Sequence, residues 1–355
     1  MSIIQIKQRL IGGDAPTYFI ADISANHDGD LGRAKALIAL AKEAGADAAK
    51  FQNFRAEHIV SSVGFESLGA QRSHQVKWRK SVVQVYAEAS LPWEWTGELK
   101  AACDAVGIDY FSTPYDFEAV DMLEPFVSMY KIGSGDITWP EMLEYVARKG
   151  KPVLVACGAS TMADVERAAA VMRSNRIQWG LMQCNTNYTG CLENFRHLHL
   201  RVLTTFAATF PDAVLGLSDH TPGHASVLGA VALGARVIEK HFTDDVSRDG
   251  PDHAFSMTPS TWREMVDRTR ELELGLGLAD KFIADNERDT VIVQRRSLRA
   301  ARPLAVGTVL KAKDVVALRP APPEALAPYE LSNIVGRHVR VSIAEGEHLR
   351  WEHFQ

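Results

Sequence analysis

The sequence is poor in cysteine and contains no C-x-x-C pair. The four cysteines are Cys103, Cys157, Cys184 and Cys191. Cys103, Cys157 and Cys184 lie in apolar segments, where a thiol usually packs as a small hydrophobic group. We therefore expect buried thiols, and a reducing cytoplasm is the simplest compartment for the protein.

The sequence also lacks a long apolar run and a cluster of basic residues. No uninterrupted apolar stretch approaches the roughly 20 residues that span a bilayer. The first residues, MSIIQIKQRLIGGD, lack the apolar core of a signal peptide. The net charge is −5 with both signs interspersed, so no basic stretch offers a row of phosphate contacts. We expect neither a membrane nor a nucleic acid as a partner.

The remaining composition is that of an ordinary soluble protein. Hydrophobic residues make up 46% of the 355 residues, and charged residues make up 23%. A chain of this length exceeds most single cores, so we expect one large domain and one small domain.

Eight short apolar runs, rich in β-branched and aromatic residues, alternate with amphipathic helical patterns. The runs span residues 18–24, 48–53, 109–114, 129–134, 152–157, 179–185, 214–219 and 236–242. Strands that alternate with helices indicate parallel βαβ units, and eight repeats over about 270 residues fit a closed barrel. A doubly wound open sheet is the alternative, but it usually carries a glycine-rich turn where this chain has ISANHDGD. The sequence therefore predicts an α/β protein with a (β/α)8 barrel, whose final helix spans 258–277 with Thr258 or Ser260 as its cap.

Two segments depart from the repeat. About forty residues separate the second strand from the helix near Trp95 and include a predicted helix over residues 73–90. Long βα loops open onto the catalytic face of a barrel, so we expect a lid or pocket wall, with a decorative insertion as the alternative. After about Asp285 the pattern becomes short, β-like and basic. We divide the chain into a barrel domain (1–282), a linker (283–292) and a small β-rich domain (293–355).

Polar residues gather where the predicted strands end, which is where barrels place functional side chains. Side chains at i and i+2 of a strand point the same way, and three such pairs occur: Lys50 and Gln52, Ser218 and His220, and Glu239 and His241. Lys131 begins the segment KIGSGD at the end of the fourth strand. Buried lysines require an anionic partner. The two lysines, with Ser134 and Ser218, therefore predict a phosphate or carboxylate ligand.

His220 and His241 follow the seventh and eighth predicted strands, which are neighbours in a barrel. Two imidazoles at adjacent strand ends can share one divalent metal ion. A lone histidine is usually structural, but the pairing favours a metal site.

Seven blocks resemble, in order, the signature blocks of the sialic acid synthase family, which includes legionaminic and pseudaminic acid synthases and spore-coat polysaccharide synthase-like proteins. The blocks are ADISANHDGDL, AGADAAKFQNF, FSTPYD, YKIGSGD, GLSDHTPG, LGARVIEKHFT and GPDHAFSM, between residues 18 and 257. The carboxyl-terminal segment resembles the antifreeze-like (SAF) domain of the same family. The resemblance therefore covers nearly the whole chain.

The resemblance implies an enzyme that condenses phosphoenolpyruvate with an N-acetylated amino-sugar aldehyde, similar to N-acetylmannosamine, and releases a nonulosonic acid and phosphate. It implies that His220 and His241 hold a divalent metal ion, preferably Mn2+, with Mg2+ as the alternative. It implies that phosphoenolpyruvate is bound by Lys50, Lys131, Ser134, Ser218, Thr113 and Gln52. It implies that Tyr188 and Asp252 contact the sugar. It further implies a domain-swapped homodimer, in which Arg319 enters the barrel of the neighbouring subunit.

The chain departs from the family pattern at four positions. Asp22 and Asp136, the expected catalytic carboxylates, stand where glutamate is common. Ala156 replaces a serine, and Thr186 holds a position often occupied by asparagine in the substrate site. These changes leave two alternatives open: a sugar-phosphate acceptor, as in the octulosonate synthases, or a non-catalytic sugar-binding homologue.

Overall fold

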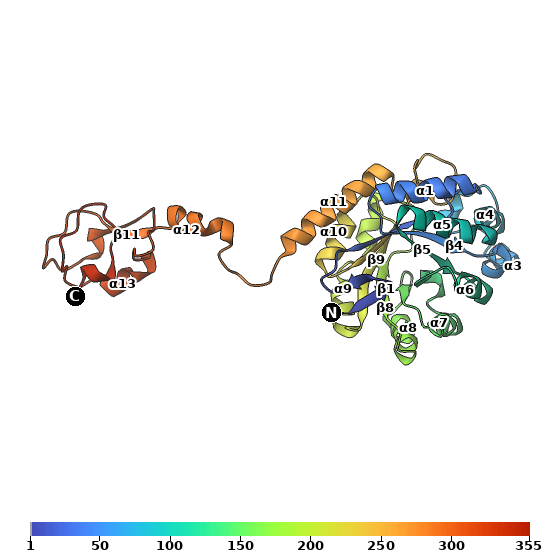
Figure 1. Cartoon of the computed structure of the whole chain (residues 1–355), viewed down its shortest axis with the longest axis horizontal. Coiled ribbons are helices and arrows are strands. Elements are labelled where there is room, and N and C mark those ends of the chain that lie inside the picture. Colours follow the sequence, from blue (N-terminus) through green and yellow to red (C-terminus); the bar gives the residue numbers. More distant parts are fainter. Residues whose placement is uncertain (1) are drawn as a thin grey trace. The chain divides into compact units, whose positions relative to one another are not determined.

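The structure, a computed structural model, describes residues 2–355 and divides into two compact units. The first unit ends at Gly277, and the second spans Leu278–Gln355 (Figure 1). Each unit has its own hydrophobic core and is described by itself. No helix within residues 2–355 combines the length and apolarity needed to cross a membrane.

Eight parallel strands form the centre of the first unit. They are β3 (Tyr18–Asp22), β4 (Ala48–Asn53), β5 (Asp109–Pro114), β6 (Tyr130–Ile132), β7 (Val153–Ala156), β8 (Trp179–Cys184), β9 (Ala213–Asp219) and β10 (Val237–His241). Strands consecutive in the sequence lie side by side, and β10 pairs in parallel with β3, so the last strand meets the first. The predicted (β/α)8 barrel and its eight strands are confirmed.

Helices follow the strands and surround the barrel (Figure 1). They are α1 (Leu31–Glu43), α5 (Thr96–Val106), α6 (Phe117–Leu123), α7 (Pro140–Ala147), α8 (Met162–Ser174), α9 (Val202–Thr209), α10 (Ala225–Ala232) and α11 (Pro259–Leu276). Several begin at a side chain that accepts from a backbone amide of the first turn, such as Asp30 for α1 and Thr161 for α8. Thr258, one of the two predicted caps, caps α11 in a reciprocal pair with Thr261.

A short hairpin, which the sequence did not predict, closes the amino ends of the strands. It consists of β1 (Ile3–Ile6) and β2 (Arg9–Gly12), paired antiparallel. Ile4 and Ile11 are fully buried in the barrel core, and a Cβ built on Gly180 of β8 would lie 3.5 Å from Ile4 Cδ1. Apolar side chains therefore fill this end of the barrel, and polar side chains gather at the opposite, carboxyl end.

The long segment after β4 contains α2 (Ala56–Ile59), α3 (Ser62–Ser67), the 3-10 turn η1 (Ser73–Lys77), α4 (Val82–Ala89) and the 3-10 turn η2 (Trp93–Trp95). The single helix predicted over residues 73–90 is wrong, because the structure divides it into η1 and α4. Ser81 accepts from the Gln84 amide, and the Gln84 side chain bonds back to the Ser81 amide. This capping box starts a new helix at Val82.

The second unit is built from short elements around a small core. They are the 3-10 turn η6 (Asp285–Glu287), α12 (Arg288–Gln294), β11 (Ser297–Ala300), η7 (Ala312–Asp314), β12 (Val315–Leu318), η8 (Pro328–Glu330), α13 (Leu331–Ile334) and η9 (Trp351–His353). β11 and β12 pair antiparallel, and isolated bridges link the loops around them. The predicted linker over residues 283–292 contains η6 and the first turns of α12.

Candidate active site

Glu239 joins two lysines at the centre of the barrel. It lies on β10, and its Oε1 accepts from Lys131 Nζ at 3.0 Å and from Ser218 Oγ at 3.1 Å. Its Oε2 lies 4.0 Å from Lys50 Nζ and has no hydrogen-bond partner. The four residues are at most 5% exposed. Lys50 and Lys131 therefore face one common centre, although they belong to different strands.

A second carboxylate completes the charge pairing. Asp22, at the end of β3, accepts from Lys50 Nζ at 2.7 Å and from Gln52 Nε2 at 3.1 Å. Thr113 Oγ1 lies 3.4 Å from the same ammonium group. We expected a bound anion to neutralise the lysines, but Asp22 and Glu239 already do so within the protein.

These ion pairs hold the charges in place despite burial. Burial works against the ammonium form of Lys50, but the nearby Asp22 and Glu239 raise its pKa above the ordinary value. Burial likewise works against ionised Glu239, but Lys131 and Lys50 lower its pKa to about 2. Lys50 and Glu239 are therefore charged at neutral pH, and their charges have opposite signs.

The two predicted metal ligands lie together directly above this centre. The ring centroids of His220 and His241 are 5.4 Å apart. His220 Nδ1 lies 3.0 Å from the Asn185 carbonyl oxygen, so this nitrogen carries the proton and Nε2 presents a lone pair. Burial, reinforced by His241, lowers the pKa of His220 to about 3, which keeps the imidazole neutral as a metal ligand must be.

The surroundings of His241 also suit a ligand. His241 Nδ1 is buried without a hydrogen-bond partner, and Nε2 lies 3.6 Å from Asp22 Oδ2. Within residues 2–355 no group of three or more histidine, cysteine or acidic side chains forms a preformed metal cage. The neutral, oriented imidazole of His220 and the unpartnered Nδ1 of His241 fit a metal ion held by two imidazoles, with water and substrate as the other ligands.

A group of small polar residues lines the barrel mouth between β6 and β8. Ser134, in the 3-10 turn η3 (Ser134–Asp136), accepts from the Gly158 amide at 3.0 Å. A Cβ built on Gly158 would lie 2.9 Å from Ser134 Oγ and 2.3 Å from Thr186 Oγ1. Thr186 Oγ1 is buried without a hydrogen-bond partner. Only glycine fits at position 158, and the two hydroxyls converge there.

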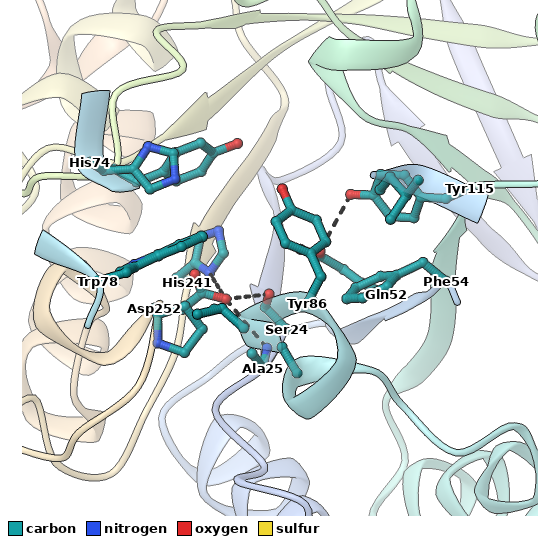
Figure 2. A pocket seen from close by; sticks show the side chains of 15 residues that line it. Ser24, Ala25, Gln52, Phe54, His74, Trp78, Tyr86, Tyr115, His241 and Asp252 are labelled. Atoms are coloured by element: carbon teal, nitrogen blue, oxygen red, sulfur yellow. Dashed lines mark hydrogen bonds and ion pairs between the residues drawn. The ribbon is translucent and has the colours of Figure 1, made fainter. Parts of the chain in front are cut away.

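A cavity of about 140 Å3 opens beside His241 (Figure 2). Its wall combines strand-end residues with residues of the long segment after β4, which confirms the predicted pocket wall. The lining residues are Ser24, Ala25, Gln52, Phe54, Ile59, His74, Trp78, Val85, Tyr86, Ala89, Tyr115, Tyr188, His241, Pro251 and Asp252.

Tyr188 and Asp252, the predicted sugar contacts, both line this cavity and both lie near His241. The Tyr188 ring packs against His220 at 4.3 Å between centroids and against His74 at 4.8 Å. Asp252 Oδ2 lies 3.8 Å from His241 Nδ1. Both residues are therefore placed where a ligand in the cavity would meet them.

Asp136 lies at the edge of the same region, at the end of η3. A Cβ built on Gly133 would lie 3.5 Å from Tyr115 Oη and 3.9 Å from Asp136 Oδ2, which places the carboxylate near the cavity wall. Asp136 Oδ2 is buried without a hydrogen-bond partner, and burial raises the pKa of this carboxyl to about 6. Asp136 can therefore exchange a proton near neutral pH.

The barrel unit thus brings together all predicted site residues except Arg319. Arg319 belongs to the second unit, where its Nε donates to the Gln294 carbonyl at 2.6 Å.

Sequence reasoning missed Glu239 as a site residue, although its spacing from His241 placed both on the inner face of one strand. It also missed the lining residues His74, Trp78, Tyr86 and Tyr115. Nothing in their local pattern distinguishes them from ordinary packing residues.

The barrel, its polar centre at the carboxyl ends of the strands and the separate small unit define a two-domain (β/α)8-barrel protein. The chain matches the model of the NeuB family over residues 37–281 and that of the SAF domain over residues 295–355. The chain belongs to the NeuB family, a family of nonulosonic acid synthases. The resemblance stated from the sequence is confirmed.

Several relatives match the chain along almost its whole length. The N,N'-diacetyllegionaminic acid synthase of Legionella pneumophila is 34% identical and covers 99% of this chain and 97% of its own. The human N-acetylneuraminate-9-phosphate synthase is 31% identical, and the match covers 96% of this chain and 93% of the human protein. The crystal structure of an N-acetylneuraminic acid synthetase from Leptospira borgpetersenii, in complex with citrate, is 27% identical. It superposes with a TM-score of 0.71 over 82% of this chain and 95% of that chain.

Proposed function

We propose that the protein condenses phosphoenolpyruvate with an N-acetylated amino-sugar aldehyde to give a nonulosonic acid and phosphate. The observation that carries the proposal is the convergence of Lys50, Lys131 and Glu239 on one buried centre beside the two imidazoles, of which that of His241 lines the cavity. Membership of the NeuB family supports the same chemistry.

The charge balance of the site indicates that a metal ion would supply positive charge as well as polarise the aldehyde. Lys50 and Lys131 are neutralised by Asp22 and Glu239, so a trianionic ligand requires further positive charge. A divalent metal ion, preferably Mn2+ or else Mg2+, would add that charge and polarise the aldehyde as a Lewis acid. His220 and His241 would hold this ion, since one is neutral and oriented by the Asn185 carbonyl and the other has a free Nδ1.

In the proposed reaction, carbon three of phosphoenolpyruvate bonds to the aldehyde carbon, water adds to carbon two, and phosphate leaves after C–O cleavage. Lys50, Lys131, Ser134 and Ser218 would bind the phosphate and carboxylate groups. Gln52, Thr113 and Thr186 would add hydrogen bonds. Asp136, with its pKa of about 6, would donate or accept a proton at the reacting oxygen. Asp22, the second of the two catalytic carboxylates, would orient the Lys50 ammonium group.

The cavity wall favours an acceptor without phosphate. None of its lining residues, all within the described chain, is a lysine or arginine, and Asp252 adds a negative charge. A phosphorylated sugar would meet that carboxylate without a compensating cation in this wall. We therefore propose a neutral acceptor that contacts Tyr188 and Asp252.

The proposal also includes a homodimer in the cytoplasm, in which Arg319 of one subunit enters the barrel of the other. The guanidinium would then face the acceptor and complete the site.

Phosphate release from phosphoenolpyruvate tests the proposed function. The protein would be incubated with Mn2+ and with N-acetylmannosamine, a diacetamido-trideoxyhexose or their phosphorylated counterparts, and the products identified by mass spectrometry. We expect a nine-carbon acid from a neutral acceptor. Release only with sugar phosphates would indicate an octulosonate synthase-like activity, and no release with any aldehyde would contradict an enzymatic function.

A further inference from the structure

Ser24 has a backbone conformation that its side chain makes unfavourable. It follows β3 with a φ of 46°, in the left-handed region where residues other than glycine are strained. The residue is 6% exposed and lines the cavity. Glycine would adopt this conformation without strain, so the hydroxyl group at this position requires an explanation.

The hydroxyl of Ser24 binds a residue that is distant in the sequence. Ser24 Oγ donates to Asp252 Oδ2 at 2.5 Å (Figure 2). The Ala25 amide donates to the same oxygen at 3.3 Å, and His241 Nδ1 lies 3.8 Å away from it. These contacts occupy Oδ2 and leave Oδ1 for a ligand.

The backbone of Ser24 holds a second carboxylate. Its amide donates to Asp22 Oδ1 at 3.1 Å, while Asp22 Oδ2 accepts from Lys50. The left-handed turn therefore directs the Ser24 amide to one site carboxylate and its hydroxyl to the other. Ser24 links the loop after β3 to the loop after β10, which carries Asp252.

We propose that Ser24 is a positioning residue that fixes the Asp252 carboxylate for binding the sugar acceptor. Asp252 precedes the 3-10 turn η5 (His253–Phe255), and its side chain does not cap that turn. Among the hydrogen bonds of the described residues, Asp252 Oδ2 accepts only from the Ser24 hydroxyl and, more weakly, from the Ala25 amide. Without the hydroxyl, the carboxylate turns more freely, and the acceptor must order it on binding.

Two substitutions of Ser24 distinguish the effect of its backbone strain from the effect of the hydroxyl group that positions Asp252. Ser24→Gly removes both the strain and the hydroxyl, whereas Ser24→Ala removes the hydroxyl alone. Both should raise the acceptor KM by roughly ten- to hundredfold, the effect of losing a hydrogen bond to a charged group. The KM for phosphoenolpyruvate should change less than about twofold, because Lys50 and Lys131 are untouched. The Tm of Ser24→Gly should exceed that of Ser24→Ala.

Arg176 offers a matched control. It also has a left-handed backbone, with a φ of 55°, and its side chain is exposed outside the cavity wall. Arg176→Gly should relieve a similar backbone strain and leave both KM values unchanged. Ser24→Gly kinetics that match those of wild type, or an equal rise in both KM values, would overturn the inference.

The inference rests on the proposed function, so a measurement without turnover keeps the two apart. Trp78 lines the cavity, and its fluorescence can report the binding of N-acetylmannosamine or a diacetamido-trideoxyhexose to the whole protein. Ser24→Gly should weaken this binding roughly tenfold or more. If wild type releases no phosphate but its sugar binding depends on Ser24, the reaction is wrong and the role of Ser24 stands. If no sugar binds, or if it binds equally to both proteins, the role of Ser24 is wrong.

Discussion

The two faces of strands β9 and β10 carry similar polar residues but differ in how completely these residues are hydrogen-bonded. On the outer face, Lys240 and Asp219 form a buried ion pair. Asp219 also accepts from the hydroxyls of Thr221 and Ser226, and Lys240 also donates to the Thr221 carbonyl. On the inner face, the neighbouring residues Glu239 and His241 each keep a buried atom without a hydrogen-bond partner.

The difference teaches how to distinguish structural from functional polar groups in one barrel. A structural pair has every donor and acceptor satisfied, because an unpaired buried group lowers stability. The inner groups, including Asp136 Oδ2 and Thr186 Oγ1, are held in position but left incomplete. Unpaired buried atoms around one centre indicate a site that a ligand completes.

The largest expected effect is on the inner face. His220→Ala or His241→Ala should lower kcat about a thousandfold or more, because each would remove one of the two proposed protein ligands of the metal ion. Phosphate release with Mn2+ measures this, and the unfolding midpoint should change little. His197→Ala, at an exposed position, serves as the control. Full activity of either inner variant after chelation would refute the metal assignment.

The outer pair should show the reverse pattern. Lys240→Met leaves Asp219 buried and uncompensated, which should lower the free energy of unfolding by about 3 kcal/mol or more. The double variant with Asp219→Leu should recover much of that loss, because both charges are then removed. Urea unfolding measures both effects. A stable Lys240→Met variant would show that the outer pair does not support the barrel.

Asp136 gives a smaller effect that depends on pH. Burial raises its pKa from 3.8 to about 6, so the folded protein binds the proton more tightly than the unfolded chain. Its contribution to stability is therefore full below about pH 4 and is lost as pH rises through about 6. Asp136→Asn should be more stable than wild type by roughly 2 kcal/mol at pH 8 and by much less at pH 4. Urea unfolding at both pH values tests this; equal pH dependence would contradict it.

Arg319→Ala gives the smallest expected effect and asks whether a neighbouring subunit completes the inner face. It should raise the acceptor KM roughly tenfold, with little change for phosphoenolpyruvate, because one charged hydrogen bond is lost. Arg340→Ala, at an exposed arginine of the same unit, should change neither. A larger rise for phosphoenolpyruvate than for the acceptor would count against the composite site.

Much of the barrel was predictable because each strand is a short run rich in apolar residues that is almost entirely buried on both faces. The two strands of the amino-terminal hairpin were missed because each has only four residues, too few for a clear periodicity. The division at Ser81 was missed because the helical pattern alone does not distinguish a serine within a helix from a serine that caps one.

The lysines and histidines of the site were predictable from their places at strand ends. Glu239 was noted but not assigned, because its role depends on lysines from two other strands. The backbone of Ser24 was not predictable, since its left-handed φ is imposed by tertiary contacts and serine shows no preference for it. The proposed entry of Arg319 into a neighbouring barrel involves a second copy of the chain, which one sequence does not describe.

The hairpin of β1 and β2 closes the amino end of the barrel, so a ligand can enter only from the carboxyl end. Lys50 and Glu239 lie one layer deeper than Gln52 and His241, because each precedes its partner by two residues on the same inward-facing row. In the proposed reaction, phosphoenolpyruvate would therefore have to reach the lower layer before the sugar covers it. The closed end then predicts an ordered binding sequence, with the anion first and the sugar second.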